Sequence, residues 1–295
     1  MKALVGIDAV GAWVSALDLL CRLWPKGLEV ELVHCIESVF PDRSFPEVGP
    51  SHPLADIYLT QRRMGEEVLE LAAKRLSDHG VPSQKHLLIG DAVRNLIGHA
   101  DSHSCDLIVL RSSVKGFWGT TLFGSTAKGV LMGAHQSVLV VKADHSGTGP
   151  VDALLATDHS PYMDRCLDLL MSSGVSGLGR ITVFTANEME SGVSDLLESE
   201  QGEELQEGLH WKRTRIQDRN ERIAERLAPL AAETGALVRD GSPNETIRQA
   251  MEESCAELLI LGAQGHGFWE RLQMGSKSFH QALSEPYSVL VLRKP

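Results

Sequence analysis

The second half of the chain contains a glycine-rich loop whose composition suits phosphate binding. The apolar run Leu258–Leu261 leads into Gly262-Ala-Gln-Gly265, and nine residues later Gly275-Ser276 opens an expected helix. Glycine permits backbone conformations with positive φ and has no Cβ to block an incoming anion. The first amides of a helix donate hydrogen bonds to anions at the positive end of the helix dipole, and a serine there adds a hydroxyl. The spacing alone is equally typical of a tight turn that binds nothing, so both interpretations stay open.

Better-known motifs for nucleotide or metal chemistry do not occur in the sequence. The first apolar run continues as Val5-Gly-Ile-Asp-Ala-Val-Gly11, which does not fit the dinucleotide fingerprint GxGxxG, and no GxxxxGK[ST] string is present. The 12 histidines are scattered, and none falls into HExxH or a Cys/His ligand run, so no metal site is expected. The five cysteines form no CxxC pair and are expected to be reduced thiols.

Charge and hydropathy exclude two classes of partner. The chain has 28 Lys and Arg against 39 Asp and Glu, a formal net charge of −11. Such a surface repels nucleic-acid phosphates, although it permits a small pocket lined by backbone amides. No apolar run approaches the roughly 18 residues that a membrane span needs. The start of the chain does not resemble a signal peptide, so we expect a cytoplasmic protein with no nucleic-acid or membrane partner.

The sequence repeats itself once. A shift of 151 places Gly116-Phe-Trp118 on Gly267-Phe-Trp269 and Gly124-Ser125 on Gly275-Ser276, and a shift of 150 places Asp8 on Asp158. Matches in the same order along both halves predict two copies of one domain, residues 1–144 and 151–295. The polar segment between them, Lys142–Pro150, suits a linker.

Within each copy, short apolar runs alternate with helical patterns. This alternation predicts an α/β fold with two tandem doubly wound domains, each a five-stranded, mostly parallel sheet flanked by helices. The expected strands are Ala3–Ile7, Val30–Ile36, His86–Ile89, Leu107–Leu110 and Val138–Val141, then Ala153–Thr157, Ile181–Thr185, Ala236–Val238, Leu258–Leu261 and Val289–Leu292. The expected helices include Met64–Leu76, Ile216–Ala232 and Asn244–Cys255, and surface loops are expected at Phe40–Pro53 and Glu188–Glu207.

Three features are shared with a known family: first strands that end in Asp, the GxxGx9G[ST] element, and final strands of Val-Leu-Val type. In these features the chain resembles the universal stress protein family. The resemblance covers nearly the whole chain, as a tandem pair. In that family this element marks ATP-binding members. The resemblance therefore implies ATP, with or without Mg²⁺, in the second copy. The residues implied to contact it are Ala156, Asp158, Thr185, Leu261, Gly262, Gly265, Gly275, Ser276, Lys277 and Ser278.

Asp158 has two open roles in this interpretation, either holding a metal on the phosphates or accepting hydrogen bonds from a ribose or from loop amides. The first copy departs from the pattern, because Arg111 replaces Gly262 and Val114 replaces Gly265. A β-branched residue raises the cost of positive φ, so one nucleotide per chain is expected, in the second copy. The alternative is that Arg111 meets an anion with its guanidinium.

These features favour a regulatory, stress-response protein that binds an adenine nucleotide and is not an enzyme, or at most hydrolyses ATP slowly. Fast phosphoryl transfer needs a water-positioning base and a charge clamp, which the motif lacks. An adenylating enzyme on the same fold and a scaffold that binds no ligand stay open as alternatives. By the same family resemblance, the last strands are expected to pair the two domains as an intramolecular pseudo-dimer, and a homodimer of chains is left open.

Overall fold

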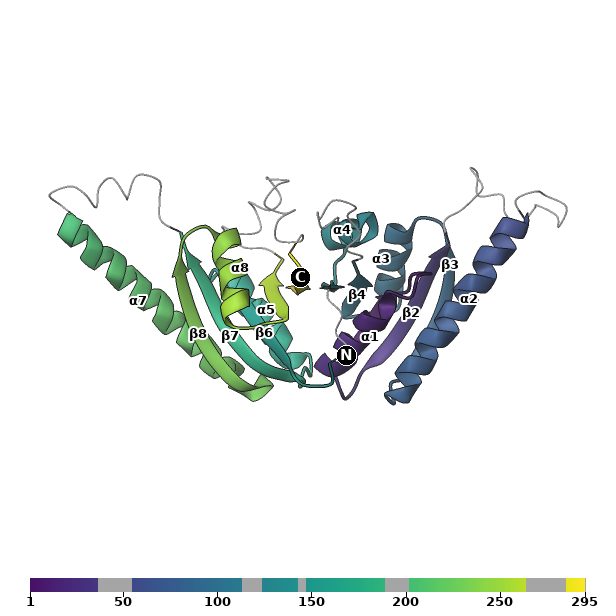
Figure 1. The fold of residues 1–295 in the computed structure, drawn as a ribbon, viewed down its shortest axis with the longest axis horizontal. Helices are drawn as coiled ribbons and strands as arrows, with labels where there is room; N and C mark the ends of the chain where they lie inside the picture. The colour runs from purple at the N-terminus through teal and green to yellow at the C-terminus, as the bar shows by residue number, and fades with distance from the viewer. Residues whose placement is uncertain (37–54, 113–123, 143–146, 189–201, 264–284, 295) are drawn as a thin grey trace. The chain divides into compact units, whose positions relative to one another are not determined.

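The computed structural model describes residues 1–36, 55–112, 124–142, 147–188, 202–263 and 285–294. It divides into two compact units, Met1–Thr148 and Gly149–Lys294, each with its own sheet and helices (Figure 1). Phe40–Pro53, Val114, Gly265, Gly275, Ser276, Lys277 and Ser278 lie outside the described residues. Among the residues that are described, no helix combines the length and the apolar composition needed to span a bilayer.

The first unit alternates strands with helices. Its described strands follow the spatial order β3-β2-β1-β4-β5, and every pair among them is parallel. Ala3, Leu4 and Val5 of the central strand are completely buried, as expected of a strand covered on both faces. The elements are β1 (Lys2–Gly6), α1 (Trp13–Leu23), β2 (Glu29–Ile36), α2 (Ala55–Asp78), β3 (Ser83–Ile89), α3 (Ala92–Ser102), β4 (Leu107–Arg111), α4 (Ser125–Gly133) and β5 (Ser137–Val141).

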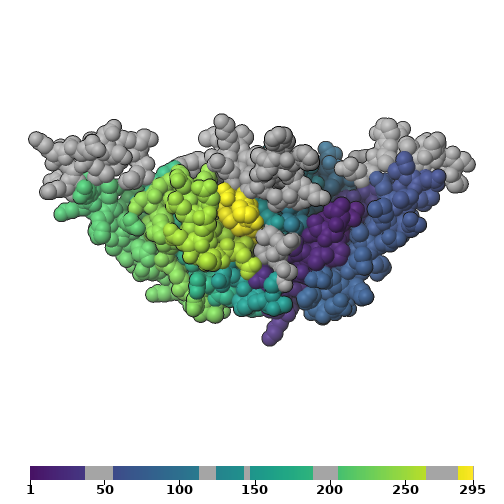
Figure 2. All heavy atoms as spheres, in the orientation of Figure 1, coloured from purple at the N-terminus to yellow at the C-terminus, as the bar shows by residue number. Residues whose placement is uncertain are grey.

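The second unit repeats this plan. Its strands follow the order β8-β7-β6-β9-β10, again all parallel among the described pairs. Helix α8 covers one face of the sheet and forms the yellow-green surface of this unit in Figure 2. The elements are β6 (Val151–Ala156), α5 (Pro161–Ser172), β7 (Leu178–Asn187), α7 (Gly202–Leu227), the 3₁₀ turn η2 (Ala228–Leu230), β8 (Ala231–Asp240), α8 (Pro243–Glu253), β9 (Leu258–Gly262) and β10 (Ser288–Leu292).

The predicted fold class is confirmed, but several element boundaries are wrong. The helix expected at Ile216–Ala232 ends at Leu227, because Pro229 cannot donate to the helical ladder, and Ala231 already begins β8. The loop expected at Glu188–Glu207 includes the first turn of α7, since its Glu, Gln and Leu residues are good helix formers. Strands β7 and β8 have 10 residues each and are longer than predicted.

The buried face of α2 also differs from the prediction. The apolar residues of the expected helix Met64–Leu76 recur at a spacing of three and four, which predicts that Met64 and Leu71 face the core. They are 44% and 58% exposed, whereas Leu69 is 3% exposed. The reason is Gly65, where a Cβ would lie 2.7 Å from both the His34 Cδ2 and the Leu87 Cδ1 atoms. The helix therefore approaches the sheet most closely at a glycine, which a search for large apolar residues does not find.

Candidate functional site

The carboxyl end of the sheet in the second unit is where its strand order reverses. Chain connections leave the first strand, β6, toward β7 on one side, while β9 lies on its other side. The β6–β9 pairing ends at Leu155 and Ile260, so the two strands are no longer paired with each other beyond these positions. In open α/β sheets, ligands bind at this reversal point.

Five of the residues predicted to bind nucleotide lie at this end of the sheet. Ala156 is the last residue of β6, and Asp158 follows it with an exposed side chain. Leu261 is 3% exposed, and Gly262 ends β9, where it is paired with Leu292. Thr185 lies on β7 next to β6.

The Asp158 turn is held by hydrogen bonds to its own backbone. The Asp158 Oδ1 atom accepts a bond from the Ser160 amide at 3.0 Å, and the Thr157 Oγ1 atom accepts one from the His159 amide at 3.0 Å. Ser160 then caps α5 by accepting from the Met163 amide at 3.1 Å, with Pro161 in the first turn. This helix therefore begins directly after the turn that carries Asp158.

Thr185 holds the two strand ends together through its side chain. Its Oγ1 atom lies 3.1 Å from the Thr157 carbonyl oxygen and 2.9 Å from the Asn220 Oδ1 atom on α7. Asn220 is completely buried and donates from Nδ2 to the Leu237 carbonyl at 3.0 Å. The hydroxyl of Thr185 is therefore engaged inside the protein.

His159 and Arg219 belong to the same end of the sheet. His159 has a φ of 57°, a left-handed conformation that is uncommon for residues other than glycine, and its Nε2 atom lies 3.2 Å from the Thr185 Oγ1. Burial, and then the charge of Arg219, lower the pKa of His159 to about 4, so its ring is neutral at pH 7. Arg219 donates from Nη2 to the His159 carbonyl at 3.0 Å and brings a cation to this edge.

The sequence analysis did not identify Asn220 or Arg219 as part of this site. A signal for Asn220 was present, because it is a polar residue at a helical spacing of three and four from the apolar Ile216 and Ile223. Arg219 gave no such signal, since it lies 60 residues from His159 in sequence.

The corresponding edge of the first unit keeps the aspartate, Asp8, but differs in its turn and in a neighbouring side chain. Asp8 accepts bonds at Oδ1 from the amides of Val10 and Ala12, at 2.9 and 3.1 Å. His34 occupies the place of Thr185, with its Nδ1 atom 2.7 Å from the Ile7 carbonyl oxygen.

Arg111, which stands where the second unit has Gly262, folds back onto its own strand ends. Its Nη1 atom donates to the Ser112 carbonyl at 2.7 Å and to the Val141 carbonyl at 3.2 Å, and it also bonds the Lys142 carbonyl. In this structure the guanidinium is therefore bound to carbonyl oxygens of the protein.

Comparison with known proteins assigns the chain to a family. A model described as the universal stress protein family matches residues 1–142 and 153–293. The chain belongs to the universal stress protein family. This universal stress protein is 28% identical over 114 residues to a curated family member from Methanocaldococcus jannaschii. That match covers 39% of the chain and 65% of the relative, slightly less than two thirds of the relative's length.

Solved structures of similar fold match the whole tandem chain. A universal stress protein from Archaeoglobus fulgidus aligns with a TM-score of 0.68 at 19% identity, covering 99% of this chain and 96% of the other. A protein from Pseudomonas aeruginosa described as a putative universal stress protein aligns with a TM-score of 0.58 at 16% identity, covering 99% and 92%. These likenesses support the two-domain fold.

Proposed function

We propose that this universal stress protein is a regulatory protein of the stress response that binds one ATP, in its second unit. The observation that carries this proposal is the placement of Asp158 and Gly262 on opposite sides of the strand-order reversal, at the ends of β6 and β9. The GxxGx9GS element, which begins at Gly262, would supply backbone amides to the phosphates. Asp158 is exposed at the same edge and would face the ribose or a phosphate-bound Mg²⁺.

The first unit supports one nucleotide per chain rather than two. The Arg111 guanidinium lies across the strand ends β4 and β5 and bonds their carbonyl oxygens, where the second unit has the bare backbone of Gly262. A ligand at that place would have to displace these hydrogen bonds, and bonds that involve a charged group contribute about 1.5–3 kcal/mol each.

The same arrangement argues for binding rather than fast catalysis. The described groups at this edge are one carboxylate, Asp158, the exposed cation Arg219 and the neutral ring of His159. Rapid phosphoryl transfer needs a base that positions water together with a charge clamp on the transferred group. We therefore infer that any hydrolysis of ATP is slow.

Calorimetric titration of the full chain with Mg-ATP tests the proposal. Wild type should bind one ATP, and Gly262→Arg, which copies the first unit, should weaken binding by at least tenfold, because a side chain then occupies the phosphate approach. The matched reverse change, Arg111→Gly, should leave both affinity and stoichiometry unchanged, because Val114 still stands where the second copy has Gly265. Asp158→Asn should weaken binding by about tenfold, since hydrogen bonds to charged groups contribute about 1.5–3 kcal/mol, whereas Asp8→Asn should not.

Several outcomes would contradict the proposal. Equal binding by wild type and Gly262→Arg would place the nucleotide elsewhere, and two ATP per chain would show that the first unit also binds. No binding at all would favour the scaffold. Release of pyrophosphate from ATP with an added substrate would favour the adenylating enzyme.

A further inference from the structure

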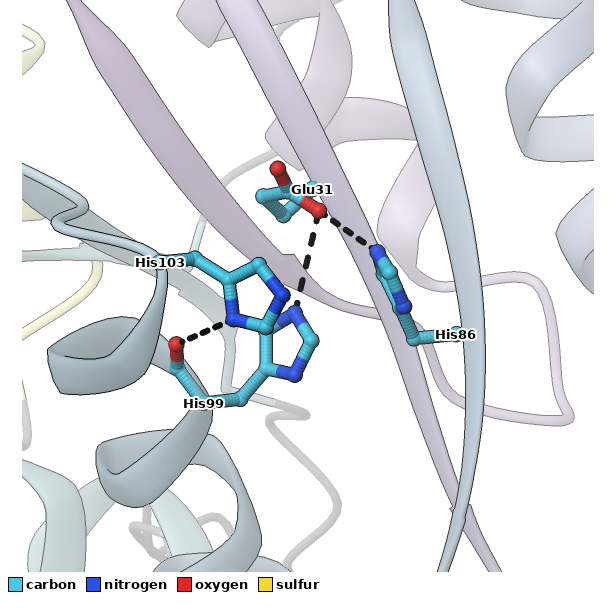
Figure 3. Close-up of side chains that lie close together, drawn as sticks. All are labelled: Glu31, His86, His99 and His103. Carbon is cyan, nitrogen blue, oxygen red and sulfur yellow. Dashed lines mark hydrogen bonds and ion pairs between the residues drawn. The ribbon is translucent and has the colours of Figure 1, made fainter.

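Three histidines and one glutamate gather in the first unit, away from the Asp8 edge. Figure 3 shows Glu31 of β2, His86 of β3, and His99 and His103 at the end of α3 turned toward one another. Each of these side chains offers one ligand atom, and the four ligand atoms lie within 4.8 Å of one another. The cluster lies between the sheet and the helix that covers it, near the start of β2.

The strand register and the helix spacing explain why these residues meet. Val33 of β2 pairs with His86, so Glu31 and His86 project from the same face of neighbouring strands. Their Oε2 and Nε2 atoms lie 2.5 Å apart. His99 and His103 are four residues apart on one side of α3, and their rings stack with centroids 3.7 Å apart. Two histidines at this helical spacing are a recurrent arrangement in zinc sites.

The free lone pairs of the cluster point to a ligand. His99 is 9% exposed, and its Nε2 atom is buried without a hydrogen-bond partner among the described residues, 3.7 Å from the Glu31 Oε2. Buried polar atoms of this kind are rare in native proteins unless something binds them. The His103 Nδ1 atom lies 3.0 Å from the His99 carbonyl oxygen, so the Nε2 atom is the ring nitrogen of His103 that faces the other cluster residues. This bond is the outer contact that commonly orients a metal-binding histidine.

Glu31 is held in place by a second contact. Its Oε1 atom lies 2.9 Å from the Lys2 Nζ atom, so Oε2 is the oxygen that faces the imidazoles. The carboxylate side chain is 2% exposed and forms an ion pair with Lys2. Glu31 thus provides a single anionic oxygen among three nitrogens.

We propose that Glu31, His86, His99 and His103 form a four-coordinate site for a divalent transition-metal ion, with Zn²⁺ as the ion that the donor set fits best. Three imidazole nitrogens and one carboxylate oxygen are ligands that Zn²⁺ takes in tetrahedral geometry. Bonds of about 2.0–2.1 Å place tetrahedral ligand atoms about 3.3–3.4 Å apart, so the cluster contracts by about 1.5 Å at its widest on binding. His86 and His103 are partly exposed, which leaves their rings free to make this adjustment and gives the ion a path from solvent.

The second unit shows that the fold does not require these residues. The aligned strand registers and helix caps place Thr182, Leu237, Ala250 and Ser254 at the four corresponding positions. Ser254 closes the end of its helix with a bond from Oγ to the Ala250 carbonyl at 2.6 Å, as His103 does with His99. The same sheet and the same helix end therefore form in the second unit without any of the four ligands.

Competition between the full, tag-free chain and a chromogenic zinc chelator tests the proposal, with the protein first stripped of metal and kept free of nucleotide. Wild type should bind one Zn²⁺ more tightly than the remaining histidines do. His86→Ala and His103→Ala should each weaken this binding by about 100-fold or more, because loss of even an outer contact costs about 10–100-fold. His79→Ala and His135→Ala are the matched controls, since both histidines are exposed in the same unit, and they should bind as wild type does.

Co²⁺ provides a readout that does not depend on whether an alanine variant folds. Four-coordinate Co²⁺ absorbs visible light much more strongly than hydrated Co²⁺, so wild type should become coloured with one equivalent. Glu31→Gln keeps the shape of the side chain and should lose most of that absorbance, whereas Asp158→Asn should retain it. Absence of a tight Zn²⁺ site in wild type, or equal binding by the cluster variants and the controls, would overturn the proposal.

Discussion

Thr185→Val should destabilise the second unit by about 1–3 kcal/mol. Valine keeps the shape of threonine but removes the hydroxyl that lies 2.9 Å from the Asn220 Oδ1 and 3.1 Å from the Thr157 carbonyl. The loss of a hydrogen bond costs about 0.5–1.5 kcal/mol, and a buried acceptor left without a partner costs about 1–3 kcal/mol. Asn220 is 0% exposed, so water cannot replace the hydroxyl, and the larger cost of the unpaired acceptor applies.

A hydroxyl has one proton, so Thr185 donates to only one of these acceptors at a time. Its Oγ1 atom also lies 3.2 Å from the His159 Nε2 atom, a contact that valine removes as well. The substitution should leave the pKa of His159 near its low value, because burial is the main cause of that shift. The loss of stability caused by Thr185→Val should therefore be the same at pH 5 and at pH 7.

Urea denaturation followed by circular dichroism measures the free energy of unfolding, and hydrogen exchange of peptides from β6 and β7 assigns the loss to the second unit. Thr182→Val is the matched control, since Thr182 is 9% exposed on the same strand and takes no part in the bonds of Thr185 and Asn220. A loss for Thr185→Val within about 0.5 kcal/mol of that for Thr182→Val would refute the assignment of energy to this network.

Two further predictions concern unusual backbone positions. His159 has its pKa lowered to about 4 against about 6.5 when unfolded, so the unfolded chain takes up the proton first as the pH falls. The free energy of unfolding should therefore drop between pH 6.5 and pH 4, by about 1 kcal/mol once the partial exposure of the ring is allowed for. Asparagine tolerates the left-handed backbone, so His159→Asn should remove that drop. Urea denaturation at several pH values measures it. Gly65→Ala should destabilise the first unit by about 1–3 kcal/mol, because its Cβ would lie 2.7 Å from His34 and Leu87. Gly208 lies in α7 with open space where a Cβ would be, so Gly208→Ala should instead stabilise the protein by about 0.5–1 kcal/mol. Equal effects of the two changes on the melting temperature would show that the approach of helix to sheet at Gly65 is not tight.

The fold could be predicted from the sequence because two independent patterns agreed. Buried parallel strands give continuous apolar runs, and the repeat at a shift of about 150 residues shows the same alternation twice. Boundaries were less accurate where tertiary contacts decide them. Strand β8 gained its first five residues, Ala231–Gly235, by pairing with β7, although several of them are polar or small.

The candidate sites could be predicted only as far as the signal was local. Gly262 ends β9 and Asp158 lies two residues beyond the end of β6, so each was recognisable from the apolar run before it. Arg219 and Asn220 reach the same edge from α7, and Arg219 lies 60 residues after His159. Only the folded chain brings these residues together. The proposed metal site combines Glu31 with histidines that lie 55 to 72 positions later in the sequence. Only the spacing of four residues between His99 and His103 was visible in the sequence.

The sheets of the two units differ from each other at the carboxyl ends of the strands and again near their amino ends. These differences indicate a division of tasks between the copies. In the second unit the carboxyl edge keeps Gly262, which has no side chain. The position equivalent to Glu31 is Thr182, which has no carboxylate to bind a metal ion. In the first unit Arg111 bonds the carbonyls at the carboxyl edge, and the other end of the sheet carries Glu31 and its histidines. A duplicated domain needs only one working copy of each site, so the other copy is free to lose it. On the proposals above, the chain would bind a nucleotide through the second unit and a metal ion through the first. Because the two sites share no residue, either site can be removed by substitution without changing the residues of the other.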